Sequence, residues 1–230
     1  MSKQIVLTAG QKAKSINRDK SIYGSFVEIG AGQEVARQFF RVGSASKTIA
    51  KTMSAYDRDF SDAIYGKEDD GRYVCKSRLN KMLNQEYDLL EERLNRNDHK
   101  ETRYFVFADT VTTINYKKTN KGHGWIGLRF QLDPKKKPND FLIHVRLKDQ
   151  EARLQQETIG VIGTNLMYGC YNETDPKLIL TQLFDNLSRG NFAIDMVEVL
   201  GPDFEDIACR LLSLPLVKER LTNAVIFTPE

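Results

Sequence analysis

Cysteine, histidine and tryptophan are scarce in this sequence of 230 residues, which contains three, three and one of them. The cysteines are odd in number and far apart, no Cys-x-x-Cys pair occurs, and no histidine lies near any of them. This pattern excludes zinc sites of the usual spacing and a disulfide framework, so we expect no metal. Cys75, Cys170 and Cys209 are expected to be buried structural thiols of a reduced, cytoplasmic protein.

Long apolar runs are also missing. None approaches the roughly 20 residues that a membrane-spanning helix needs, and the N-terminus has no apolar stretch followed by a cleavage site. We therefore expect no contact with membranes. The formal net charge is only +3, so the sequence does not favour nucleic acid as a partner. Basic residues gather in an N-terminal arm, residues 1–20, and in two loops near residues 117–121 and 135–137.

The remaining composition is that of an ordinary globular protein, with 40% hydrophobic and 28% charged residues. Residues 1–230 are enough for one α+β domain with one large core, which is the organisation that we expect. The last strand that we predict, residues 223–228, lies close to Glu230. We therefore expect the chain to be the N-terminal part of a longer protein.

Hydrophobic periodicity predicts an α+β fold in which a mixed sheet contains an antiparallel three-stranded meander over about residues 103–148, with helices packed on it. Strand-like segments lie at 22–29, 103–116, 124–132, 141–148, 192–200 and 223–228. Helical patterns lie at 33–42, 44–56, 76–95, 150–171 and 175–190, followed by two short ones that begin at Pro202 and Pro215. In the segment 76–95, Leu79, Leu83 and Leu90 belong to one apolar stripe, which we expect to be buried.

Alternation along the meander assigns its side chains to two faces. If the second hairpin is centred on the loop 133–140, Leu128 lies opposite Val145 and Phe130 opposite Ile143, with these apolar side chains toward the core. The same register pairs residues on the opposite face: Arg129 with His144, Gly127 with Arg146, and Trp125 with Lys148. The preceding hairpin adds two further pairs: Asp109 with Gln131, and Thr113 with Gly127.

This opposite face contains the candidate ligand-binding residues Arg129, Arg146, His144, Trp125 and Asp109. Arginine binds phosphate or carboxylate in a bidentate manner, and the tryptophan ring offers a stacking surface. His144 exchanges a proton near neutral pH and is the candidate catalytic residue. The alternative is an ordinary solvated sheet face, which a direct pairing of Asp109 with Arg129 would favour.

A glycine-rich turn, Gly30-Ala31-Gly32, follows the first predicted strand. Glycine permits a positive φ or a close backbone approach, and the next helix would offer free amides to an anion. With Glu28 before it, the turn resembles the first motif of class I methyltransferases. However, Glu34 stands at the third glycine position, and two predicted helices replace the expected next strand. We therefore interpret the turn as structural first, and a methyltransferase is only the third functional hypothesis.

Three stretches, GSFVEIGAGQEVARQFFRVG, SKTIAKTMSAYDRDFSDAIYG and GHGWIGLRFQ, resemble an uncharacterised family of longer bacterial proteins. Members of that family often bear the labels TonB-dependent receptor or nicotinate-nucleotide adenylyltransferase. The sequence has neither the strand series and export signal of the first nor the histidines that the second uses after its first strand. The resemblance implies a C-terminal portion beyond this chain, and it brings no catalytic residues.

The leading hypothesis is a cytoplasmic domain that binds an anionic or nucleotide-like small molecule on its cationic sheet face. The alternative is a protein-interaction or assembly module, whose partner is the C-terminal portion of the same protein or a second copy of the chain. The sequence specifies no cofactor, and it leaves open whether the domain is an enzyme.

Overall fold

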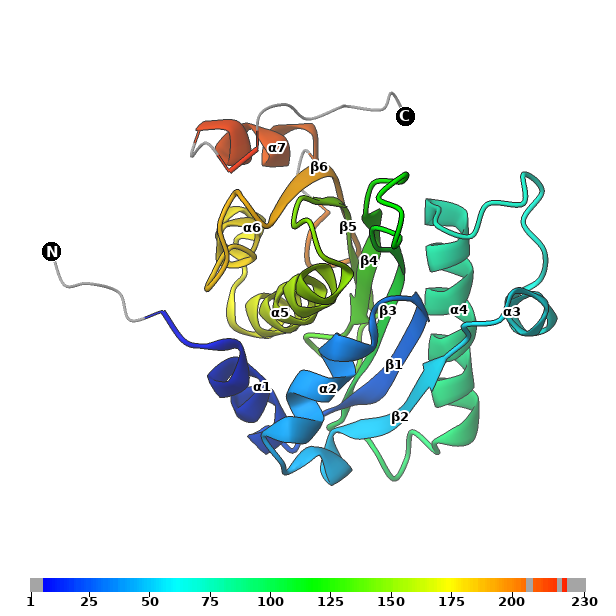
Figure 1. The fold of residues 1–230 in the computed structure, drawn as a ribbon. Coiled ribbons are helices and arrows are strands. Elements are labelled where there is room, and N and C mark those ends of the chain that lie inside the picture. Colours follow the sequence, from blue (N-terminus) through cyan, green and yellow to red (C-terminus); the bar gives the residue numbers. More distant parts are fainter. Residues whose placement is uncertain (1–5, 206–208, 219–220, 223–230) are drawn as a thin grey trace, which may run out of the picture.

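The computed structural model describes residues 6–205, 209–218 and 221–222. In these residues, α-helices and one 3-10 helix surround a six-stranded sheet (Figure 1). The helices are α1 (Ala9–Arg18), α2 (Gln33–Arg41), η1 (Ala45–Lys47, 3-10), α3 (Arg58–Tyr65), α4 (Lys76–Arg93), α5 (Ala152–Asn172), α6 (Pro176–Gln182) and α7 (Cys209–Lys218). The strands are β1 (Ile22–Gly30), β2 (Ile49–Ser54), β3 (Arg103–Thr112), β4 (His123–Phe130), β5 (Asn139–Leu147) and β6 (Phe192–Leu200). None of the helices in this described part has the length and apolar character needed to cross a bilayer.

The sheet has the strand order β2-β1-β3-β4-β5-β6. β1 is parallel to both of its neighbours, and every pairing from β3 to β6 is antiparallel. The predicted mixed sheet with an antiparallel meander is confirmed, with β3, β4 and β5 as the meander and β6 as its continuation. Short connections favour the antiparallel pairing of β3, β4 and β5, because consecutive strands joined by loops pair antiparallel. β6 joins the sheet only after α5 and α6.

Helices cover both faces of the sheet (Figure 1). α1, α2, α5 and α6 lie on one side, which we call the α5 face, and α4 with α3 lies on the other, the α4 face. Aromatic residues form the centre of the α5 face: the ring of Phe26 lies 5.1 Å from that of Phe39 and 5.4 Å from that of Phe105, centre to centre. Burial of such rings is the main stabilising contribution to a core of this kind.

Two glycines of α5 allow that helix to pack closely against α2. An ideal Cβ on Gly160 would lie 2.9 Å from Cβ of Glu34, and one on Gly163 would lie 2.6 Å from a methyl carbon of Val35. The glycines that interrupt this helical pattern in the sequence therefore mark a close helix contact rather than a break.

α4 forms as predicted and ends at Arg93, close to the expected boundary. Leu79 and Leu83 are fully buried and Leu90 is 7% exposed, so the predicted stripe is the face that packs on the sheet. Leu79 and Leu83 approach the backbone of Gly127 in β4, where an ideal Cβ would lie within 3.1 Å of both side chains. The space above Gly127 is thus filled by the helix.

The expected helix over 44–56 is wrong. Gly43 and Ser44 both have positive φ, η1 follows, and residues 49–54 form strand β2 beside β1. β2 is an edge strand with half-buried and exposed residues in alternation, and its sequence gives only a weak apolar pattern. α6 also ends earlier than predicted, and Pro215 lies within α7 rather than at the start of a helix. The predicted strand 223–228 lies outside the described residues.

The predicted basic arm is helical from Ala9 onward, with Thr8 and Gln11 forming a reciprocal capping box at the start of α1. Lys12 is 1% exposed, and its ammonium group lies 2.5 Å from a carboxylate oxygen of Asp185. This part of the arm therefore belongs to the packed fold.

The cysteines do not share one environment. Cys170 is buried in the core of the α5 face, and burial raises the pKa of its thiol. Cys75 is only half-buried, and its Sγ lies 3.1 Å from Oγ of Ser77, so the expectation of burial is wrong for it. The side chain of Cys209 lies outside the described part of the structure.

Candidate functional site

The parallel strands β1 and β3 end at one edge of the sheet, which we call the carboxyl edge; β4 begins there and β5 ends there. The chain leaves β1 into α2 on the α5 face, whereas it enters β3 from α4 on the other face (Figure 1). Adjacent parallel strands with connections on opposite faces form a topological switch point. Ligands of open α/β sheets bind outside the carboxyl ends of the strands at such points.

The predicted glycine turn lies at this edge. Gly30 has a φ of +93°, which favours glycine, and an ideal Cβ there would lie 2.0 Å from the carbonyl oxygen of Val111. Gly32, at the N-terminus of α2, has an ordinary φ of −93°, but a Cβ on it would lie 1.9 Å from Oδ2 of Asp109. One glycine is therefore required by the backbone and the other by the contact with a carboxyl group.

Asp109 lies under this turn beside Glu28, its direct partner in the parallel ladder between β1 and β3. Both are buried, with exposed fractions of 0% and 3%, and neither oxygen of Asp109 has a hydrogen-bond partner among the described residues. Burial raises the pKa of Glu28 to about 7. Burial, and then the neighbouring Glu28, raise the pKa of Asp109 well above its usual range. Burial and the neighbouring carboxyl group therefore both favour the protonated, neutral form of Asp109.

The predicted position of Asp109 on the cationic face is wrong. Its partner in β4 is Ile126, not Gln131, and its side chain lies on the α5 face. Thr113 does not pair with Gly127 either, because Gly127 lies opposite Ala108. The loop between these strands is centred earlier in the sequence than predicted, and the partner of Asp109 shifts by five residues. A shift by an odd number moves a side chain to the other face.

The register of the second hairpin is also shifted, here by four residues, so every residue stays on its predicted face. Leu128 lies opposite Phe141, and Phe130 lies opposite Asn139. Gln131 closes this hairpin from within: its Nε2 donates to the carbonyl oxygen of Lys136 at 2.7 Å, and its Oε1 accepts from the backbone N–H of Tyr104. On the α4 face the observed pairs are Trp125 with His144, His123 with Arg146, and Arg129 with Asp140.

Arg129 is separated from the other predicted site residues. Its guanidinium makes two 2.7 Å contacts with the carboxylate of Asp140 and a third with Oδ1 of Asn84. A bidentate pair of this kind satisfies the planar guanidinium. Arg129 is thus neutralised by Asp140 and not by Asp109, and it does not converge with His144 and Arg146.

His144 belongs instead to a hydrogen-bonded chain of polar groups in β4, β5 and β6, which we call the histidine chain. Its Nδ1 contacts Oδ1 of Asp195, and its Nε2 lies 3.2 Å from Nδ1 of His123. The other oxygen of Asp195 accepts a hydrogen bond from Nε of Arg146 at 2.5 Å. The ring of Trp125 packs beside these groups, 5.1 Å from the ring of His144, centre to centre. Three predicted residues therefore meet here, joined by Asp195 and His123, which the sequence reasoning missed.

Asp195 reaches both partners because of a β-bulge. The register between β5 and β6 shifts between His144 and Val145, whose partners are Met196 and Ile194, so Asp195 is the extra residue. Bulges redirect side chains in this way and are frequent at functional sites. The available sequence signal was weak: one acidic residue within the apolar run 192–200.

The electrostatics of this chain follow from its partial burial. Burial alone would raise the pKa of Asp195, but hydrogen bonds and charge from His144 and Arg146 outweigh it and lower the pKa. Burial lowers the pKa of His123, and His144 and Arg146 lower it further. The Asp195 carboxylate is thus charged and the His123 ring is held neutral, as a proton acceptor requires.

His123 and Arg146 also line a cavity of about 520 Å³ at the carboxyl edge, the edge pocket. Its wall includes the loop between β3 and β4, the end of β5 and the start of α5. The charged side chains among its lining residues are Lys118, Lys121, Arg146, Lys148 and Asp149. Arg146 is already paired with Asp195, so the three lysines against Asp149 give the pocket its excess of positive charge. The other lysine loop lies at the opposite edge of the sheet, where Lys136 pairs with Asp203.

In the described residues, no group of three or more histidine, cysteine, aspartate or glutamate side chains is placed to hold a metal ion. No family model and no curated protein sequence matches the chain. These comparisons therefore support neither the label TonB-dependent receptor nor the label nicotinate-nucleotide adenylyltransferase.

The fold of this chain is similar to several solved structures of the competence-damaged protein (CinA) superfamily. The protein from Enterobacter cloacae has a TM-score of 0.49 and 9% identity, covering 75% of this chain and 97% of its own. The competence/damage inducible protein CihA from Agrobacterium tumefaciens has a TM-score of 0.45 and 17% identity, covering 74% and 100%. The protein from Klebsiella pneumoniae has a TM-score of 0.45 and 6% identity, covering 72% and 96%. At these values the similarity bears on neither ligand nor reaction.

Proposed function

We propose that the chain binds an anionic, nucleotide-like small molecule in the edge pocket. The observation that carries this proposal is the convergence of Lys118, Lys121 and Lys148 on one cavity, with Asp149 as the only carboxylate among its lining residues. Arg146 also lines the cavity but is paired with Asp195. Like charges in a cavity repel one another, and an anion relieves that repulsion. The cavity is of the size that small-molecule sites have.

The start of α5 adds to the attraction for an anion. Glu151 precedes this 21-residue helix without forming a side-chain cap, and Gln155 of its first turns lines the pocket. The first amides of a helix and its dipole favour negative charge. An anion in the edge pocket would therefore be attracted by the lysines and by the helix terminus together.

The histidine chain gives the same site a proton acceptor. If Nδ1–H of His144 donates to Asp195, Nε2 of His144 accepts from Nδ1–H of His123, and Nε2 of His123 keeps its lone pair. His123 would then accept a proton from a bound molecule, while His144 and Asp195 hold its tautomer and stabilise the resulting charge. His144, the candidate catalytic residue of the sequence, acts here through His123 and is a positioning residue.

Calorimetric titration at low ionic strength tests the proposal, with inorganic phosphate and adenosine monophosphate as probes. We expect saturable binding that weakens as salt is added. Lys121→Met should weaken it roughly threefold to tenfold, because an exposed side chain facing the ligand is lost without disturbing the core. Lys117→Met is the matched control, since Lys117 is an exposed lysine of the same loop that does not line the pocket.

Two results would overturn this function. One is the absence of saturable binding of both probes at low salt. The other is an equal effect of Lys121→Met and Lys117→Met, which would mean that only the general charge of the loop matters.

The alternative, an assembly module, is favoured by a different part of the surface. β2 pairs only with β1 in the described residues, so its outer side offers free backbone groups. Tyr56 and Phe60 follow it and are 79% and 57% exposed. Light scattering of the wild type and of a Tyr56→Ser/Phe60→Ser variant tests this function: an oligomer that dissociates in the variant would support it.

A further inference from the structure

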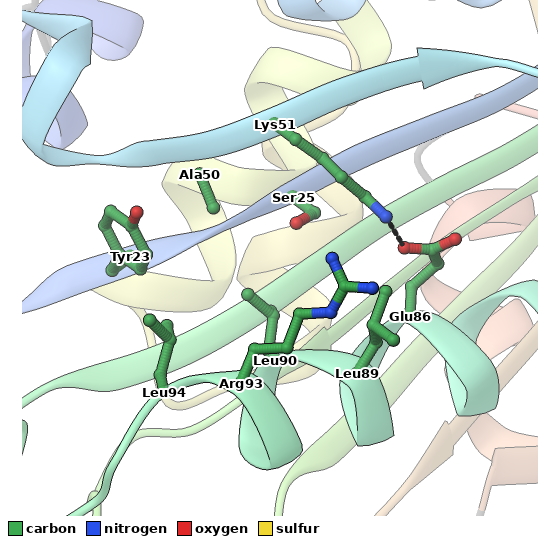
Figure 2. A pocket seen from close by; sticks show the side chains of 9 residues that line it. All are labelled: Tyr23, Ser25, Ala50, Lys51, Glu86, Leu89, Leu90, Arg93 and Leu94. Carbon is green, nitrogen blue, oxygen red and sulfur yellow. Dashed lines mark ion pairs between the residues drawn. The ribbon is translucent and has the colours of Figure 1, made fainter.

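A second, smaller pocket lies on the α4 face, far along the strands from the edge pocket. It has a volume of about 230 Å³ and lies between the first half of β1, the start of β2 and the C-terminal half of α4 (Figure 2). We call it the α4 pocket. None of its lining residues belongs to the histidine chain or to the edge pocket.

At one end of the α4 pocket, Lys51 and Glu86 neutralise each other as an ion pair. Nζ of Lys51 lies 2.5 Å from Oε2 of Glu86, which is 2% exposed, and the hydroxyl of Tyr65 donates to Oε1 of Glu86 at 2.9 Å. These contacts hold the carboxylate in place on α4, and the pair contributes no net charge to the pocket.

Ser25 lies next to this pair, with Lys51 as its direct partner in the parallel ladder. The residue is 1% exposed, and its Oγ has no hydrogen-bond partner among the described residues. A buried hydroxyl without a partner costs roughly 1 to 3 kcal/mol. Because Ser25 lines the pocket, an acceptor atom of a bound molecule would satisfy it.

Arg93 supplies the net charge. It is exposed in the last turn of α4, and no ion pair or hydrogen bond of its guanidinium is found within the described part of the chain. Figure 2 shows this guanidinium extending from α4 into the space below Ser25 and Lys51. An unpaired cation and an unpaired hydroxyl therefore face the same small space.

The remaining wall is apolar. Leu89, Leu90 and Leu94 of the α4 segment and the ring of Tyr23 line it. A cavity of about 150 Å³ holds a benzene molecule, so this one has room for a ring or a short chain of about six carbons with one small polar group. It is too small and too apolar for a nucleotide.

We propose that the α4 pocket is a binding site for a small monocarboxylic acid with an apolar body. The carboxylate pairs with Arg93 and accepts a hydrogen bond from Ser25, and the apolar body packs on Leu89, Leu90 and Leu94. A carboxylate is favoured because one guanidinium matches one negative charge and its planar, two-oxygen geometry. The proposal does not depend on the edge pocket.

Benzoate and its neutral analogue benzamide are the probes, titrated into the full chain and followed by calorimetry or ligand-detected NMR. We expect benzoate to bind with a dissociation constant of about 1 mM or lower, and benzamide roughly tenfold more weakly. Arg93→Met should weaken benzoate binding about tenfold and leave benzamide unchanged, since only the charged partner is removed. Ser25→Ala should weaken the binding of both probes.

Arg37→Met is the matched control, because Arg37 is an exposed arginine of α2, on the opposite face of the sheet, and forms an ion pair with Glu34 of the same helix. It removes the same charge and should leave benzoate binding unchanged. Arg93 is exposed, so Arg93→Met is expected to fold, which thermal unfolding checks directly. The proposal is overturned if benzoate shows no saturable binding, if benzamide binds as tightly, or if Arg37→Met weakens binding as much as Arg93→Met.

Discussion

Glu28 and Asp109 lie directly opposite each other on neighbouring parallel strands, buried and without a cation beside either carboxyl group in the described residues. Charging both of these buried, neighbouring carboxyl groups is costly, so burial and mutual repulsion favour the protonated form of the pair in the folded state. The fold therefore contains an acid pair whose protonation contributes to stability, at the switch point of the sheet.

The first prediction concerns stability against pH. The pKa of Glu28 rises from its ordinary value of 4.5 to about 7 on folding. An acid whose pKa is higher in the folded than in the unfolded state contributes its full stabilisation below the unfolded pKa. This contribution is lost as the pH rises through the folded pKa. Between about pH 4.5 and 7 the free energy of unfolding should fall, on the order of 3 kcal/mol from Glu28 alone. Urea unfolding at a series of pH values measures it.

Glu28→Gln removes the titrating group and should flatten this part of the profile, so the variant gains on the wild type as pH rises. Glu157→Gln is the control, because Glu157 is an exposed acid of α5 that pairs with Arg153 one helical turn away. A wild-type profile that rises between pH 4.5 and 7, or a Glu28→Gln profile parallel to it, would contradict the assignment.

The second prediction concerns the contact between Gly32 and Asp109. The backbone of Gly32 suits any residue, so Gly32→Ala tests the steric contact alone and should cost about 1 to 3 kcal/mol. Gly32→Ala combined with Asp109→Ala should lose less than the sum of the two single changes, because the clash is gone. Gly10→Ala in α1, where a Cβ would lie 3.5 Å from Val42, is the control and should be neutral or stabilising. Additive losses would show that the carboxyl group moves aside freely.

The third prediction concerns α4. Leu83 is fully buried against the sheet, and Leu83→Ala should lower the free energy of unfolding by about 2 to 5 kcal/mol. Leu89→Ala on the same helix removes a half-buried side chain and should cost distinctly less. Chemical denaturation measures both variants, and equal losses would mean that the helix packs along another stripe.

The sequence predicted the elements whose hydrophobic pattern is strong. α4, β6 and the three strands of the meander appear close to their expected bounds, because their apolar residues repeat at the period of the element. β2 was missed, since an edge strand with one exposed side shows little of that period. Without β2, the sequence-based prediction also lacked the β1-α2-β2 unit and therefore the switch point at the carboxyl edge.

The candidate site was only partly predictable. Alternation placed Arg146, His144 and Trp125 on one face correctly, because even-numbered errors in register preserve the face. It failed for Asp109, where the loop between β3 and β4 gave an odd-numbered error. The role of Asp195 depends on a bulge, which a single sequence does not reveal.

The last prediction joins the histidine chain to the edge pocket. Burial lowers the pKa of His123, and the neighbouring His144 and Arg146 lower it further, so NMR titration should find its ring below the ordinary value of 6.5. Bound phosphate would stabilise the protonated ring and raise this pKa, and Lys121→Met should reduce that rise because it weakens binding. Lys117→Met should leave the rise unchanged. If His123 titrates above its ordinary value, or phosphate leaves its pKa unchanged, the histidine chain does not serve an anion in the edge pocket.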